Sequence, residues 1–124
     1  MIRILLALAV GLAATPASAQ SLAKQGERVF QQCYSCHSVD RRETGLPGPN
    51  LAGVVGRRAG LERGFDYSPA LKRAAARGLT WTPQVLERFL ADPEAVVPHT
   101  AMNYFGLKKP HDRQALIAYL KTKR

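Results

Sequence analysis

The sequence predicts a small all-α domain of about four short helices, joined by long loops that wrap around a central group other than protein. Apolar residues recur at helical spacing in four separate segments, and no alternating run is long enough for a confident strand. About thirty residues between His37 and Tyr67 are rich in Gly and Pro. A loop that long is unusual in a compact domain. It is explained if a buried planar cofactor gives the loop an apolar surface to wrap.

The first nineteen residues have the pattern of a secretory signal peptide. Arg3 supplies a positive start, Ile4 to Ala14 are apolar, and Ala17-Ser18-Ala19 is an A-x-A cleavage site. An uncleaved membrane anchor is the alternative, but the apolar run is shorter than the roughly 18 to 20 residues of a spanning helix. We therefore expect a signal peptide over residues 1–19, a single mature domain over residues 20–124, and an exported protein.

The first predicted helix covers about residues 21–33. Ala23, Gly26 and Phe30 fall on one side of it at a spacing of 3.6 residues, and charged or amide side chains lie between them. This pattern is typical of an amphipathic helix, and it leads directly into the two cysteines of the chain.

The ends of the next two helices are marked by their own residues. Ser68-Pro69 precedes residues 70–77 and Gly78 follows them, which gives a serine cap, a proline in the first turn and a glycine beyond the last. In the same way Thr82-Pro83 begins a third helix, and Asp92-Pro93 ends it.

The last predicted helix begins near Pro110 or Asp112. Leu116, Ile117 and Leu120 form its apolar face. With this element, four helices account for the apolar periodicity of the chain.

The chain is strongly basic. Without residues 1–19 it has 17 Lys and Arg against 9 Asp and Glu, a formal net charge of +8. Such a surface favours acidic partners. Nucleic acid is the usual partner of a small basic domain, but an exported protein does not meet the genome, so we expect no nucleic-acid binding.

The strongest chemical signal is Cys33-Tyr34-Ser35-Cys36-His37. Two thiols separated by two residues can form thioethers with the two vinyl groups of a haem, and the adjacent histidine can then bind the iron. A redox disulfide is one alternative, but in thioredoxin-like proteins the C-x-x-C pair belongs to a βαβ unit. A zinc site is another, but only His99 and His111 remain as further Cys or His ligands. The pattern favours covalent haem attachment over both.

Beyond this motif the sequence resembles the class I cytochromes c. The similarity covers nearly all of the chain after the signal peptide. It rests on segments whose order and separation match that family: Gly26-Glu27-Arg28-Val29-Phe30, Gly48-Pro49-Asn50-Leu51, Gly56-Arg57, Tyr67-Ser68, Trp81, Pro98-His99-Thr100-Ala101-Met102 and Tyr119-Leu120. The resemblance implies the small cytochrome c fold around one covalently bound haem c.

The resemblance also implies that His37 and Met102 are the two axial ligands of the iron. Met102 is the only methionine after the signal peptide. A single methionine is more often core filler than ligand, but this one stands where the family's thioether binds iron. His99 and His111 remain competitors for that position.

Further haem contacts follow from the same comparison. The family's Gly-Pro carbonyl accepts a hydrogen bond from the ligand histidine, which implies that Pro49 orients His37. Arg57, Tyr67 and Trp81 stand where donors surround a haem propionate. Gly26 stands where a glycine lets the first and last helices approach closely.

The implied function is electron transfer. With both axial positions filled, the protein is a carrier and not an enzyme. It would shuttle single electrons through an exposed haem edge, in the bacterial periplasm. The alternative is a haem protein with a labile sixth ligand, acting as a peroxidase or gas sensor.

Expected partners are larger redox proteins with acidic docking faces: a quinol-oxidising cytochrome complex, a terminal oxidase, a photosynthetic reaction centre or a dehydrogenase. They would meet a basic rim formed by Lys72, Arg73, Lys108, Lys109 and either Arg57 or Arg58. Transient contact at a membrane surface fits this charge, and we expect a monomer.

Overall fold

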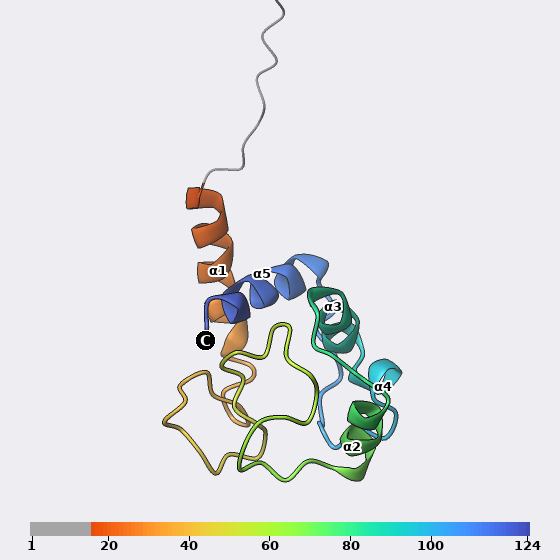
Figure 1. Ribbon diagram of the computed structural model, residues 1–124. Coiled ribbons are helices and arrows are strands. Elements are labelled where there is room, and N and C mark those ends of the chain that lie inside the picture. Colours follow the sequence, from red (N-terminus) through yellow and green to blue (C-terminus); the bar gives the residue numbers. More distant parts are fainter. Residues whose placement is uncertain (1–15) are drawn as a thin grey trace, which may run out of the picture.

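The computed structural model describes residues 16–124, and these residues form a helical domain (Figure 1). Its five helices are α1 (Pro16–Phe30), α2 (Pro69–Ala76), α3 (Pro83–Ala91), α4 (Pro93–Val96) and α5 (Pro110–Lys121). Within the described residues there is no strand, and the one β-bridge joins Arg58 to Thr80. The predicted all-α fold class is therefore confirmed.

The signal-peptide prediction falls mostly outside the described residues. Positions 1–15 lie beyond them, and positions 16–19 form the first turn of α1. Among the described residues, no helix has the length and apolar character needed to cross a membrane.

Three features of the helices differ from the prediction: α1 begins at Pro16 and not at about residue 21, it ends earlier, and one further helix follows α3. Helix α1 ends at Phe30 and not at Cys33, because the N–H groups of Gln32 and Cys33 donate to carbonyls only three residues back, at 3.2 and 2.8 Å. The backbone thus tightens into successive turns before the cysteines. Helix α4 was not predicted: Asp92 takes an extended conformation that ends α3, and Pro93 then begins one further turn.

The predicted helix caps are present. The Ser68 hydroxyl accepts a hydrogen bond from the Leu71 N–H at 3.2 Å, and the Thr82 hydroxyl accepts one from Val85 at the same distance. Each satisfies an N–H group that has no partner within its own helix. These caps fix where α2 and α3 begin.

Helices α1 and α5 cross and pack against each other, as Figure 1 shows. At the crossing, a Cβ on Gly26 would overlap the Ala115 carbonyl and lie 2.7 Å from the Tyr119 Cβ. Phe30 and Leu116, which are 1% and 2% exposed, fill the core beneath. The predicted role of Gly26 is confirmed, because only a residue without a side chain allows this approach.

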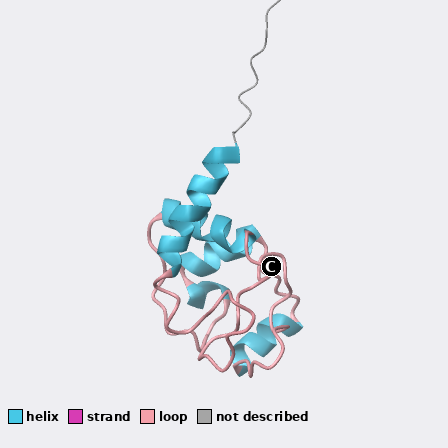
Figure 2. Cartoon of the chain, turned by 90° about the vertical axis from the view of Figure 1, so that its left-hand side faces the viewer, coloured by secondary structure: helices cyan, strands magenta, loops and turns pink. Residues whose placement is uncertain are grey.

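The long loop over residues 38–68 has no helix and wraps one end of the domain (Figure 2). Backbone hydrogen bonds fasten it to the segment before α3: Gly56 donates to Trp81, Trp81 to Arg57 and Ala59 to Leu79, each at 2.8 Å. Val54 and Ala59 of this loop are buried in the same core as the helices. The loop is therefore a fixed wall of the domain.

We predict that Gly26→Ala destabilises the protein by about 3 kcal/mol, because its methyl group would overpack the crossing of α1 and α5. Urea unfolding followed by circular dichroism measures the change. Helix propensity alone predicts the opposite result, an increase of about 1 kcal/mol in the free energy of unfolding. The control Arg28→Ala, on the exposed side of α1, is expected to change stability by no more than about 0.5 kcal/mol. A Gly26→Ala protein as stable as the parent would contradict the close crossing.

Candidate cofactor site

The two cysteines lie on a single turn that follows α1. The N–H groups of Cys36 and His37 both donate to the Cys33 carbonyl, at 3.1 and 2.9 Å. Both thiols are free; Cys33 is half-buried against the core and Cys36 is exposed. The turn therefore presents two unpaired thiols with a histidine directly behind them.

The environment of Cys33 does not suit a redox disulfide. Burial, and to a lesser degree the neighbouring Cys36, raises the pKa of the Cys33 thiol to about 11. Thiol–disulfide catalysts need a thiolate, and their sites lower the cysteine pKa. At neutral pH the Cys33 thiol keeps its proton, which weakens the thioredoxin-like alternative.

His37 is buried and its ring is fixed by one hydrogen bond. Its Nδ1 lies 2.7 Å from the Pro49 carbonyl oxygen, which is the contact expected from the sequence. A carbonyl oxygen can only accept, so Nδ1 carries the proton. Burial lowers the pKa of His37, although the bond to Pro49 partly opposes this. The imidazole is thus neutral at pH 7, and its Nε2 lone pair is available to a metal ion.

The backbone around Pro49 holds this contact in place. The Gly48 N–H donates to the Cys36 carbonyl at 2.8 Å, and a Cβ on Gly48 would lie 2.5 Å from the His37 Cε1. Asn50 ties the next residues down: its side-chain amide donates to the Asp40 carbonyl at 2.7 Å. The sequence did not predict separate roles for Gly48 and Asn50. In the structure, Gly48 leaves room for the His37 ring, and Asn50 fixes the backbone next to Pro49.

Met102 lies on the loop between α4 and α5. It is partly buried, packs against the core, and its N–H donates to the Thr100 hydroxyl at 3.2 Å. The loop continues onto α3, where the Leu107 N–H donates to the Leu90 carbonyl at 2.7 Å. These contacts fix the loop on both sides of the thioether.

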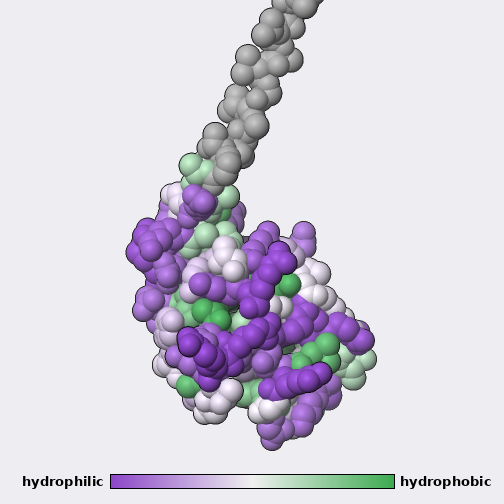
Figure 3. Space-filling view, turned by 60° about the vertical axis from the view of Figure 1, so that its left-hand side comes forward, coloured by the Kyte–Doolittle hydropathy of each residue, from purple (hydrophilic) through white to green (hydrophobic). Residues whose placement is uncertain are grey.

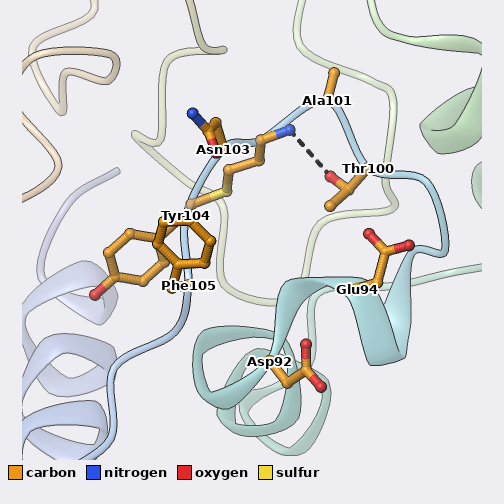
Figure 4. Close-up of a pocket in the computed structure, with 8 residues that line it drawn as sticks. Asp92, Glu94, Thr100, Ala101, Asn103, Tyr104 and Phe105 are labelled. Carbon is orange, nitrogen blue, oxygen red and sulfur yellow. Dashed lines mark hydrogen bonds between the residues drawn. The ribbon is translucent and has the colours of Figure 1, made fainter.

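A hollow of about 340 Å³ adjoins Met102. Figure 4 shows Asp92 and Glu94 on one side of this hollow and the rings of Tyr104 and Phe105 on the other. Phe105 is 87% exposed, the largest exposure among the bulky apolar side chains described. Met102 therefore lies at the edge of the hydrophobic core, next to a hollow that opens to the surface.

The two competing histidines lie in different settings. His99 is exposed, and its N–H donates to the Glu94 carboxylate at 2.7 Å. It adopts a positive φ of 63°, which non-glycine residues seldom take. His111 is exposed on α5, and its Nε2 contacts the Gln25 side chain of α1 at 2.6 Å.

Arg57, Tyr67 and Trp81, the predicted propionate donors, form one connected group. Arg57 makes an ion pair with Glu62, Nη1 to Oε2 at 2.8 Å, and the Glu62 N–H donates to the Tyr67 hydroxyl oxygen at 3.1 Å. The Trp81 N–H donates to the Arg57 carbonyl, and the Trp81 ring packs edge-on against Phe89, with ring centroids 4.8 Å apart. Sequence reasoning missed Glu62, since no periodic pattern relates two positions of an irregular loop.

One polar atom of this group has no partner. Arg57 Nε is the only buried side-chain nitrogen or oxygen of the described residues without a hydrogen bond. Leaving such a group unpaired costs about 1–3 kcal/mol. An acceptor supplied from outside the chain would satisfy it.

These donors fit the group that the family resemblance implies. Two free thiols share one turn, a neutral imidazole keeps a free lone pair, a thioether lies on a second fixed loop, and the buried Nε–H of Arg57 lacks an acceptor. Each of these suits a covalent haem, whose vinyl groups would take the thiols, whose iron would take the imidazole and the thioether, and whose carboxylates would take a guanidinium. Within residues 16–124, no three His, Cys, Asp or Glu side chains lie together as ligands of one metal ion would.

Comparison with known proteins gives a consistent result. The sequence model of the cytochrome c family matches residues 23–123. The chain is 45% identical over 101 residues to cytochrome c2 of Afifella marina, covering 82% of each chain. It is 44% identical over 100 residues to cytochrome c of the plant Gossypium barbadense, covering 80% of this chain and 87% of the relative.

Solved structures have the same fold. Cytochrome cH from Methylobacterium extorquens superposes with a TM-score of 0.74 at 43% identity, covering 82% of this chain and 98% of its own. Cytochrome c2 from Rhodospirillum centenum gives a TM-score of 0.76 at 33% identity, covering 82% of this chain and 97% of its own.

We predict that Gly48→Ala raises the reduction potential of the haem-loaded protein. The added methyl group would push the His37 ring away from Pro49, and a weaker Nδ1–H bond makes the imidazole a poorer electron donor to the iron. Spectroelectrochemistry measures the shift, which we expect to reach tens of millivolts, with about 59 mV for a tenfold change in the equilibrium. Pro47→Ala, an exposed neighbour, is the control. An unchanged potential in Gly48→Ala would count against the orienting role of Pro49.

Proposed function

Because this chain belongs to the cytochrome c family, we propose that its iron is held by His37 and Met102 and that it passes single electrons through an exposed haem edge. Membership gives the coarser facts: one covalently attached haem c, and the role of an electron carrier rather than an enzyme. The ligand set, the partners and the location are the parts proposed here.

The roles of the chain's residues follow from the site. Cys33 and Cys36 would hold the haem by thioether bonds, and His37 Nε2 and the Met102 sulfur would bind its iron. The bound haem supplies reversible one-electron chemistry. Thioether ligation favours reduced iron relative to a second imidazole, so this ligand pair gives a comparatively high potential.

The observation that carries the proposal is the His37–Pro49 hydrogen bond. It fixes the tautomer, the ring orientation and the free Nε2 at the end of a cysteine turn. A histidine that served only to pack the core would need neither an Nδ1–H fixed by a hydrogen bond nor an accessible lone pair on Nε2. The held ring also keeps ligand movement small when the iron changes charge.

We also propose an exported, periplasmic location and acidic redox partners of respiratory or photosynthetic systems. Lys72, Arg73, Lys108, Lys109 and Arg58 are exposed, and we expect them to form the basic rim. Arg57, the other option for this rim, is excluded because its side chain is only 17% exposed and is paired with Glu62. Figure 3 shows hydrophilic side chains over most of one face, with small hydrophobic patches between them.

Met102→Ala tests the ligand assignment. Reduced parent protein is expected to leave carbon monoxide unbound, because both axial positions are filled, whereas the reduced variant should bind the gas rapidly. Optical spectra after mixing measure the reaction. His99→Ala is the control and should stay unreactive. Rapid gas binding by the parent would instead favour the peroxidase or gas-sensor alternative.

Ionic strength tests the basic rim. Oxidation of the reduced protein by ferricyanide, an anion, should slow several-fold between low and physiological salt. The double variant Lys108→Gln/Lys109→Gln should be slower than the parent at low salt. The matched double variant Lys121→Gln/Arg124→Gln, at the exposed C-terminal end, should show a smaller loss of oxidation rate at low salt. Equal losses in the two variants would show that net charge, and not the rim, controls encounter.

A further inference from the structure

The loop over residues 50–67 contains a half-buried carboxylate, that of Glu62, which has no part in the proposed ligand set. Glu62 and Arg57 are 19% and 17% exposed, and their Oε2 and Nη1 atoms lie 2.8 Å apart. Removing charged groups from water is costly unless they are well paired and hydrogen-bonded. Water alone therefore does not stabilise the charges of this pair, and their burial indicates a role beyond that of a surface ion pair.

Arg57 has more donors than the chain accepts. Nη1 also donates to the Ala52 carbonyl at 3.1 Å, and Nη2 donates to the Asn50 carbonyl at 3.2 Å. A guanidinium carries five N–H groups. Its Nε–H is buried and has no acceptor among the described residues. One edge of the guanidinium is thus held by Glu62 and the loop backbone, and the Nε–H is left for another acceptor.

Tyr67 leaves a second donor in the same group. Its oxygen accepts the Glu62 N–H at 3.1 Å, and none of the hydrogen bonds of the described residues uses its O–H as donor. Burial raises the pKa of Tyr67, so the hydroxyl keeps its proton. Glu62 thus contacts both predicted propionate donors, Arg57 through its side chain and Tyr67 through its backbone.

We propose that Glu62 is a positioning residue that lowers the haem reduction potential by sharing the Arg57 guanidinium with a haem carboxylate. This rests on the proposed function and on the family resemblance, which implies that Arg57 lies beside a haem propionate. Two carboxylates then divide one positive charge. With Glu62 in place, Arg57 neutralises the haem carboxylate only partly, and the remaining negative charge favours oxidised iron, which carries one more positive charge.

The test is the reduction potential of haem-loaded variants at pH 7. Glu62→Gln keeps an oxygen that can accept from Arg57 but removes the charge, so the one-electron equilibrium should shift about tenfold toward the reduced form, or ~59 mV. Glu62→Ala, a second neutral variant, should shift it in the same direction. Glu62→Asp keeps the charge and should stay near the parent.

Glu87→Gln is the matched control. Glu87 is also paired with an arginine, Arg113, whose side chain is 13% exposed, but this pair joins α3 to α5 and has no unsatisfied nitrogen. The reduction potential of Glu87→Gln should differ from that of the parent much less than the potential of Glu62→Gln does.

Two results would overturn the role of Glu62. One is a Glu62→Gln shift no larger than that of Glu87→Gln, and the other is a Glu62→Asp shift as large as that of Glu62→Gln, which would indicate a purely structural effect. Failure of the proposed function would look different, since the parent protein itself would then lack low-spin haem and a reversible potential.

Discussion

The hydrogen bond from His37 to the Pro49 carbonyl is the interaction on which the rest of the site depends. It connects the turn that follows α1 to the long loop, which has no helix of its own to fix its position. On the other side, the same turn is anchored by the crossing of α1 and α5 at Gly26. The ring of His37 is therefore held from two directions by the protein alone. As the proposed iron ligand, a histidine held in this way would need little movement when the charge of the iron changes, and this is what an electron carrier requires.

A haem also explains why residues 38–68 can form a wall of the domain without secondary structure. The loop is fastened at its edges by backbone hydrogen bonds to the segment before α3. Arg57 Nε is the one buried side-chain nitrogen or oxygen of the described residues without a hydrogen bond, and it belongs to the group that we propose faces a haem carboxylate. The cofactor would thus supply both the apolar surface that the loop covers and the acceptor that Arg57 lacks. Fold and function are coupled here, because the haem would extend the helical core in which Val54 and Ala59 of the loop are buried.

What the sequence predicted well was encoded locally. Ser68-Pro69 and Thr82-Pro83 mark helix starts through contacts within one turn, and the Cys33 to His37 spacing defines its own chemistry. Pro49 was reached only through family resemblance, since twelve residues separate it from His37. The early end of α1, the extra turn of α4 and the Arg57–Glu62 pair were missed. Each depends on tertiary packing or on an irregular backbone, and neither produces a periodic pattern.

The central claim is that His37 and Met102 would together bind the haem iron, so that the haem would supply only electron transfer. Proton NMR of the reduced, haem-loaded protein tests it most directly. Ring current from the haem should shift the Met102 methyl and methylene resonances far upfield, and these resonances should be absent from Met102→Leu. A reduced protein whose methionine methyl resonates at an ordinary position would contradict the claim, since the thioether would then not lie over the haem.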